Sequence, residues 1–320
     1  MVNRMIKVSI MITLYNKEQW FERCFDSIVR QTYKNMECII VDDCSTDKSL
    51  ELAERLVGNY TGNIKFVVIK HAQNCGVAIT RNTCINNSNG EYLYFLDADD
   101  EITENCINSL VLFAQKYPSV DIVQGNMYQY PRVENDFYEL KGKLPEFVSG
   151  NLEIKRKYSE VLPVNPVNKL FRKKFITQNY LYYKEKLIHE DFHWHFFMMK
   201  KIGSFAFTEE YCYIRYYVPD SIMTTPNLFP SISSYLIIVE DILSNLDVDL
   251  LEQQLKQIRV ILNNQKKNIL SDEKYSSLMP KCKELLKKTP NKRFFAVLIM
   301  REITKKIKQR ISSIVNKIFR

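Results

Sequence analysis

Several features are scarce in this sequence, and each absence excludes a class of protein. Glycine accounts for only 8 of the 320 residues, which argues against a glycine-rich linker or a fibrous repeat. No apolar run approaches the ~20 residues that a membrane-spanning helix needs. The eight cysteines include no C-x-x-C pair, and most sit in apolar stretches. We therefore expect them to be small hydrophobic residues in a reducing compartment.

The composition that remains is that of an ordinary soluble globular protein. Hydrophobic residues make up 46% and charged residues 26% of the chain, so a hydrophobic core is expected. A length of 320 residues suits one large domain with an appendage, or two domains. The first apolar run, residues 8–15, is too short and too soon polar for a signal peptide. We expect a cytoplasmic protein.

Apolar and amphipathic segments alternate through residues 8–130. Runs rich in β-branched or aromatic residues predict buried strands at 8–15, 36–41, 64–69, 92–96 and 121–130. Apolar residues at helical spacing predict helices at 16–31, from 45–47 onward, at 76–86 and at 103–117. Asn16 and Thr103 are the predicted capping residues of two of these helices. The alternation predicts an α/β fold, with a mostly parallel sheet flanked by helices.

The pattern changes in the second half of the chain. Residues 131–163 have mixed polarity and no clear periodicity. From about Pro230 onward the spacing predicts helices only, at 231–246 and 250–262. We place a boundary between Pro226 and Pro230, which gives a first domain at 1–228 and a helical C-terminal region at 229–320.

Polar side chains follow three of the predicted strands. They come as pairs at the strand ends, namely Thr13 with Tyr15, Asp42 with Asp43, and Asp97 with Asp99. In open α/β sheets, ligands bind in the crevice beyond the carboxyl ends of the strands. We therefore expect these three pairs to converge on one binding crevice.

The last of these ends carries three carboxylates, in the run Asp97-Ala98-Asp99-Asp100. Carboxylates this close repel one another unless a cation lies between them. Mg²⁺ and Mn²⁺ prefer oxygen ligands, and commonly bind through one or two carboxylates plus substrate phosphates. The run therefore predicts a divalent-metal site, although acids that end a strand and open a helix give a simpler alternative.

Three stretches of the first hundred residues resemble family 2 of the glycosyltransferases, which has the Rossmann-like GT-A fold. They are VSIMITLYNKEQWFERCFDSIVRQTYKNMECIIVDDCSTDKS (8–49), NCGVAITRN (74–82) and NGEYLYFLDADD (89–100). The resemblance implies inverting transfer of a sugar from a nucleotide donor, usually a uridine diphosphate sugar, with Mn²⁺ or Mg²⁺ as the cofactor. It also implies a glycan or lipid-linked acceptor in surface polysaccharide synthesis.

The resemblance assigns roles position by position. The residues that match the family's nucleotide-sugar site are Thr13, Tyr15, Asp42, Asp43, Arg81, Asp97 and Ala98. Among them, Thr13 and Tyr15 are similar to residues that flank the base, and Asp43 to the one that binds uracil. Arg81 is similar to an arginine beside the nucleotide, Asp97 to a residue at the ribose, and Asp99 to the metal ligand. Thr13 and Thr80 stand where the family often has Pro and Ala, and neither change removes a functional group.

A later part of the chain resembles the acceptor half of capsule and cell-surface members. The matching runs are residues 168–173, 188–191, 213–215 and 221–223. In those members a Glu-Asp pair opens a helix under the acceptor, and its aspartate is the general base that inverting transfer needs. The resemblance therefore points to Asp191 as the base, with Glu190 as the second choice.

Two other functions remain open at this stage. His189-Glu190-x-x-His193 matches the H-E-x-x-H pattern of zinc hydrolases, although this leaves the three polar strand ends unexplained. The basic C-terminus could instead bind nucleic acid, but the chain has no helix-turn-helix, zinc or RNA-binding pattern. We therefore expect no nucleic-acid partner.

The C-terminal tail combines charge with an apolar stripe. After Pro290, Glu302 is the single acid among basic residues, and isoleucines recur at three- and four-residue steps from Ile303 to Ile318. A basic amphipathic helix of this kind suits the surface of an anionic membrane, so we expect peripheral attachment at the inner face of the cell membrane. The alternative is that the stripe packs on the first domain or on a second subunit of an oligomer.

Overall fold

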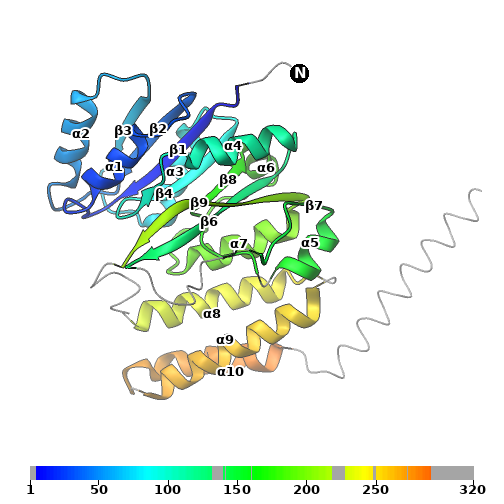
Figure 1. The fold of residues 1–320 in the computed structure, drawn as a ribbon. Helices are drawn as coiled ribbons and strands as arrows, with labels where there is room; N and C mark the ends of the chain where they lie inside the picture. Colours follow the sequence, from blue (N-terminus) through cyan, green and yellow to red (C-terminus); the bar gives the residue numbers. More distant parts are fainter. Residues whose placement is uncertain are drawn as a thin grey trace, which may run out of the picture. The chain divides into compact units, whose positions relative to one another are not determined.

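The first apolar segment of the chain forms the central strand of a parallel group. In the computed structural model, β1 (Val8–Leu14) pairs in parallel with β2 (Met36–Asp42) on one side and β4 (Tyr92–Asp97) on the other. β3 (Lys65–Lys70) extends the group beyond β2, also in parallel (Figure 1). Every residue of β2 is buried, because helices cover both faces of a sheet of this kind.

The remaining strands make the sheet a mixed one. β8 (Lys169–Arg172) runs antiparallel to β4, and β6 (Ile122–Tyr130) runs antiparallel to β8. β9 (Ser204–Tyr216) lies parallel to β6 and pairs antiparallel with two short strands, β5 (Glu101–Ile102) and β7 (Phe147–Ser149). The resulting nine-stranded sheet has the order β3-β2-β1-β4-β8-β6-β9-β5, with β7 beside β9. The parallel strands predicted from the N-terminal alternation are present, whereas the antiparallel ones come largely from the later segments.

The helices of this unit connect and cover the strands. They are α1 (Phe21–Val29), α2 (Ser49–Asn59), α3 (Val77–Asn87), α4 (Cys106–Lys116), α5 (Asn151–Tyr158), α6 (Lys173–Gln178) and α7 (Glu190–Lys201). α3 packs on β1 and β2, whereas α4 packs on β6, β8 and β9. The core between the helices and the sheet consists of buried aliphatic and aromatic side chains, including those of Ile10, Ile39, Tyr94 and Trp194.

Two helices begin later than their predicted capping residues, Asn16 and Thr103, would place them. α1 starts at Phe21, because Asn16 has a positive φ of 51° and does not cap it. The Asn16 Oδ1 atom instead accepts a hydrogen bond from the Thr46 amide at 2.8 Å, which ties two strand-end loops together. α4 starts at Cys106, because the preceding residues form β5 and the Thr103 hydroxyl donates to the Tyr211 carbonyl at 2.8 Å.

A second compact unit follows the first. The chain divides into Met1–Pro226 and Asn227–Arg320. Within the second unit, α8 (Leu228–Ser244), α9 (Leu251–Ser271), a 3-10 helix η2 (Glu273–Leu278) and α10 (Met279–Lys288) pack on one another. Its buried side chains include those of Ile232, Leu255 and Leu262. The helical character predicted for 231–246 and 250–262 is confirmed, whereas α10 was not foreseen.

The structure describes residues 5–131, 140, 142–159, 161–217, 228–247, 250–271 and 273–289. The predicted amphipathic tail and the 221–223 motif lie outside these ranges. None of the helices within them is both long and apolar enough to cross a membrane.

Candidate active site at the ends of three parallel strands

The carboxyl ends of β1, β2 and β4 meet at one edge of the sheet. Thr13 is in register with Val41 of β2 and with Asp97 of β4, and Leu14 is in register with Asp42. The Asp43 amide also donates to the Leu14 carbonyl at 2.8 Å. Since all three predicted polar ends share this edge, the predicted convergence is confirmed.

The three carboxylates at the end of β4, those of Asp97, Asp99 and Asp100, differ in their surroundings. The side chain of Asp97 is 42% exposed and that of Asp99 is 18% exposed. The Asp100 carboxylate is buried and accepts hydrogen bonds from the Tyr213 hydroxyl at 2.7 Å and the Tyr216 amide at 2.8 Å. Burial raises the pKa of Asp100, and the charges of Asp97 and Asp99 act in the same direction. Asp100 therefore fixes the end of β9, and the accessible pair is Asp97 and Asp99.

Two cations from distant parts of the chain reach Asp99. The Lys17 ammonium lies 2.5 Å from Asp99 Oδ2, and the Arg23 guanidinium donates to the Asp99 carbonyl at 2.7 Å. The loop that carries Lys17 is fixed by its own amide, which donates to the Ser49 hydroxyl at 2.6 Å. The sequence analysis missed both residues, because each lies more than 70 positions from Asp99.

The side chains around Asp99 fit a hard divalent cation. Asp99 and Asp97 supply carboxylate oxygens at an accessible strand end, which are the ligands that Mg²⁺ and Mn²⁺ prefer. Lys17 already supplies positive charge at Asp99 Oδ2. A bound metal would therefore exchange places with an ammonium rather than enter an unpaired cluster of acids.

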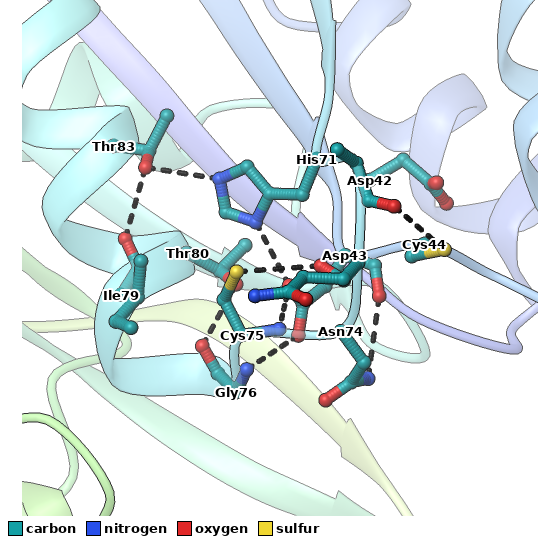
Figure 2. A network of polar contacts seen from close by, with 12 residues as sticks. Asp42, Asp43, Cys44, His71, Asn74, Cys75, Gly76, Ile79, Thr80 and Thr83 are labelled. Carbon is teal, nitrogen blue, oxygen red and sulfur yellow. Dashed lines mark hydrogen bonds and ion pairs between the residues drawn. The ribbon is translucent and has the colours of Figure 1, made fainter.

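The two acids at the end of β2, Asp42 and Asp43, also differ in their surroundings. The Asp43 carboxylate accepts hydrogen bonds from the amides of Cys75 and Gly76 and contacts the His71 ring, each at 2.8 Å (Figure 2). Asp42 is buried, and its Oδ2 accepts from the Ser45 amide at 3.2 Å. Its Oδ1 has no hydrogen-bond partner in the part of the chain that the structure describes. Because this oxygen is buried, Asp42 faces the protein interior, and Asp43 is the acid that lies nearer to the surface.

Thr13, Tyr15 and Ala98 line the same strand ends. Ala98 is buried, Thr13 is half-buried and Tyr15 is exposed. Tyr15 precedes the loop of Asn16 and Lys17, whose positive φ at Asn16 turns the chain towards the β2 end. A large exposed aromatic side chain at a polar strand end can stack on a flat ring of a ligand.

Arg81 of α3 links this edge of the sheet to α7. Its buried guanidinium forms an ion pair with Glu190, lies 3.7 Å from Asp97 Oδ1, and sits 5.2 Å above the centre of the Tyr183 ring. Burial acts to lower the pKa of Arg81, but Glu190, Tyr183, Asp97 and Asp191 together outweigh it, and the net pKa is raised. For Glu190, burial raises the pKa and the Arg81 charge lowers it, and the net pKa is raised. Arg81 therefore brings the 97–99 and 190–191 regions together.

Asp191 is the second residue of α7. It is half-buried, and its Oδ1 accepts a hydrogen bond from the Phe192 amide at 2.8 Å. The helix is anchored behind it by Trp194, whose indole donates to the Leu181 carbonyl at 3.0 Å and stacks on Tyr183 at 4.9 Å. Whereas Glu190 is engaged by Arg81, the Asp191 carboxylate keeps acceptor capacity for a substrate hydroxyl.

The H-E-x-x-H pattern does not form a zinc site of the hydrolase type. Such a site needs both histidines on one helix face, but His189 precedes α7 and has a left-handed φ of 66°. Glu190, which would be the base of a hydrolase, is instead paired with Arg81. The geometry therefore does not support the alternative of a zinc hydrolase, because α7 begins one residue too late for the motif and Glu190 is paired with Arg81.

Lys169 is a buried ammonium that the sequence analysis left without a role. Its Nζ donates to the Asn165 carbonyl at 2.5 Å and to the Val167 carbonyl at 3.4 Å. Burial lowers the pKa of Lys169 to about 7, while the Asp191 carboxylate acts in the opposite direction. Because it fixes the loop before β8, Lys169 supports the strand that lies next to β4.

We expect this lysine to make the stability of the first unit pH-dependent. Its pKa is about 7 when folded and ~10.4 when unfolded, so the unfolded chain binds more protons between these values and stability rises with pH. In Lys169→Met this contribution is absent. As the pH is lowered from 10 to 6.5, the unfolding free energy of the variant should therefore rise relative to that of wild type by on the order of several kcal/mol. Denaturation followed by the fluorescence of Trp20 and Trp194, which both lie in the first unit, measures both proteins. Parallel pH profiles for the two would contradict the buried-lysine account.

Comparison with known proteins places this edge of the sheet in context. The profile of "Glycosyl transferase family 2" matches residues 9–180, which is more than half of the chain. The glycosyltransferase GlyA of Streptococcus pneumoniae is 35% identical over 132 residues, 41% of this chain and 18% of GlyA. The uncharacterized glycosyltransferase YibD of Escherichia coli is 28% identical over 228 residues, 68% of this chain and 63% of YibD. The chain thus spans less than two thirds of the length of both relatives.

Solved structures share the fold. Residues 1–349 of TarS from Staphylococcus aureus, in complex with UDP-GlcNAc, match with a TM-score of 0.66 at 19% identity, over 89% of this chain and 82% of that one. The mannosyltransferase PcManGT of Pyrobaculum calidifontis, in complex with GDP-Man and Mn²⁺, matches with a TM-score of 0.57 at 15% identity, over 95% and 81%. These matches confirm the predicted GT-A architecture. With the family profile covering the strands that build the site, the chain belongs to glycosyl transferase family 2.

Proposed function

We propose that this glycosyltransferase inverts the anomeric centre as it moves a sugar from a uridine diphosphate donor to a hydroxyl of a glycan or lipid-linked acceptor. The observation that carries the proposal is the Arg81 link, which brings Asp97 at the donor edge and Glu190 beside Asp191 to one guanidinium. A general base close to the donor is what single displacement requires. The alternative of a nucleic-acid-binding protein rests on the C-terminal tail, which the structure does not describe.

The donor nucleotide is assigned to the ends of β1 and β2. Tyr15 offers an exposed ring for stacking on the base. Asp42 is fully buried, and its Oδ1 atom is also buried, whereas the Asp43 side chain keeps a small exposed fraction of 5% beside the loop of residues 71–76. We therefore assign the base contact to Asp43, the residue favoured by resemblance, and place Asp42 behind it at the end of β2.

The diphosphate is assigned to the end of β4. Asp99 is the proposed ligand of a divalent metal, which when bound supplies charge neutralisation of the departing diphosphate. Lys17, released from Asp99 Oδ2, adds a second positive charge at the same place. Asp97 is held by Arg81 and stays beside the ribose. The structurally similar PcManGT holds GDP-Man together with Mn²⁺, which supports this arrangement.

The acceptor is assigned to the N-terminus of α7. Asp191 takes the proton of the attacking hydroxyl, and Glu190 positions Arg81 instead of acting as the base. A role in surface polysaccharide synthesis is supported by the Staphylococcus epidermidis teichoic acid poly(glycerol phosphate) polymerase, which is 27% identical over 183 residues.

Donor binding should depend on a divalent cation and on Asp99. Calorimetric titration of a panel of uridine diphosphate sugars, in Mn²⁺ and after chelation, measures this. Removal of the metal should weaken binding at least about tenfold, because the diphosphate then loses a divalent charge and Lys17 remains paired with Asp99. Asp99→Asn should lose the metal effect, whereas Glu91→Gln, a change at the opposite end of β4, should keep it. Equal affinity before and after chelation would exclude the metal role.

A further inference from the structure

Lys169 carries a positive charge into the interior of the first unit. Only 2% of the residue is exposed, and its Nζ atom donates to neutral oxygens of Asn165 and Val167. Gln124, which is in register with Lys169 on β6, is neutral as well. Burying an ammonium among neutral groups costs free energy, and burial accordingly lowers the pKa of Lys169. A residue that destabilises the fold in this way is a candidate for a role in function.

The face of β8 that carries Lys169 is covered by α7. Lys169 and Phe171 lie two residues apart on β8, so their side chains point to one face of the sheet. The Phe171 ring meets the Trp194 ring of α7 edge-on, with 5.2 Å between the ring centres. Asp191 lies three residues before Trp194 and so on the same side of α7. Because β8 is antiparallel to β4, Lys169 is the residue of β8 nearest the carboxyl end of β4, the edge that the N-terminus of α7 reaches through the Arg81 ion pair.

The charges of Lys169 and Asp191 act on each other. The Asp191 carboxylate favours the charged form of Lys169, against the effect of burial. The hydrogen-bond partners of this ammonium are neutral carbonyl and amide oxygens, so its charge is not cancelled by its own contacts. In the low-dielectric interior of a protein such a charge acts over several ångströms. Lys169 therefore favours the ionised form of Asp191 without occupying its oxygens.

The other titratable groups around this pair leave the interaction intact. Burial and then the charge of Lys169 lower the pKa of His195, one turn along α7 from Asp191, to about 3, so His195 is neutral. Arg81 of α3 is already paired with Glu190. From the segment before α7, Asp191 is faced by two groups whose pKa values burial shifts toward the neutral forms, His189 and Tyr183. The charge of Lys169 thus remains available to Asp191.

We propose that Lys169 is a positioning residue for the base, and that its buried ammonium keeps Asp191 ionised and its oxygens open to the acceptor hydroxyl. The inference rests on the proposed role of Asp191 and deepens it. An ammonium in direct contact with the carboxylate would compete with the acceptor, whereas one that is held by the carbonyls of Asn165 and Val167 supplies charge alone. An ionised carboxylate is what the abstraction of the hydroxyl proton requires.

The pH dependence of turnover tests this role. Initial rates of uridine diphosphate release are measured for the full chain, with water as the attacking hydroxyl and the tightest-binding sugar nucleotide of the panel above as the donor. Lys169 is charged on the acid limb of the kcat profile, because its pKa is about 7. Lys169→Met should move that limb to higher pH by about one unit, so turnover at a fixed pH on the limb should fall about tenfold. At pH 6.5 the variant should be at least as stable as wild type, which separates the loss of turnover from a folding defect.

Lys173→Met is the matched control. It removes an ammonium just beyond the other end of β8 that also donates to a carbonyl, that of Ser88 at 2.5 Å, and its acid limb should not move. In an Asp191→Asn background, Lys169→Met should have no further effect on turnover. An unmoved limb in Lys169→Met, with Asp191→Asn impaired, would overturn the role of Lys169 alone. Wild-type turnover in Asp191→Asn would overturn the base assignment, and this inference with it.

Discussion

Asp191→Asn should lower turnover by about 10²–10⁴-fold, which is the usual contribution of a general base. Asparagine has the same shape, and its carbonyl oxygen can still accept the hydrogen bond from the Phe192 amide. It cannot take the proton of the acceptor hydroxyl. Because Asp191 lies outside the proposed donor contacts, donor affinity should stay within about twofold of wild type. Initial rates of uridine diphosphate release, with and without acceptor, measure the effect.

Glu185→Gln is the matched control for this change. Glu185 is an exposed carboxylate in the segment just before α7, so its substitution removes the same charge from the same part of the chain. Its turnover should stay near that of wild type. Wild-type turnover in Asp191→Asn would refute the base assignment, and a simultaneous loss of donor binding would indicate a structural defect instead.

Arg81→Met should be the most destabilising single change at the site. It leaves the Glu190 carboxylate buried without its partner, and breaking a buried ion pair in this way costs about 3–5 kcal/mol. Adding Glu190→Gln removes the stranded charge, so the double variant should recover much of that loss in unfolding free energy. Denaturation followed by tryptophan fluorescence gives the unfolding free energies of wild type, the two single variants and the double variant.

Activity should separate from stability in the same series. The double variant lacks the guanidinium that holds Asp97, so it should remain impaired in donor binding even though it is folded. A double variant no more stable than Arg81→Met would contradict the buried ion pair. Full activity in that variant would show that the Arg81 link has no part in the reaction.

The sequence predicted the frame of the site well, for a physical reason. Strands buried on both faces appear as continuous apolar runs, so β1, β2 and β4 and their polar ends could be located from residue type alone. The parallel arrangement then placed Thr13, Asp42 and Asp97 at one edge, which the register confirms. The antiparallel strands were harder, because β5 and β7 are only two and three residues long.

The partners of each site residue could not be predicted in this way. Lys17 reaches Asp99 across 82 residues, and Arg81 reaches Glu190 across 109, and no local pattern encodes such contacts. Nor does periodicity decide between adjacent residues just past a strand end. Asp42 and Asp43 look alike in sequence, yet Asp42 is fully buried whereas Asp43 accepts hydrogen bonds from the loop at residues 71–76.

The anomeric configuration of the first-formed product tests the central claim most directly. Proton NMR of sugar transferred or released from an α-linked uridine diphosphate donor, recorded in Mg²⁺ before mutarotation, gives this result without knowledge of the natural acceptor. A single displacement assisted by Asp191 predicts that the β-anomer appears first. First appearance of the α-anomer would mean that configuration is retained, and would contradict the account.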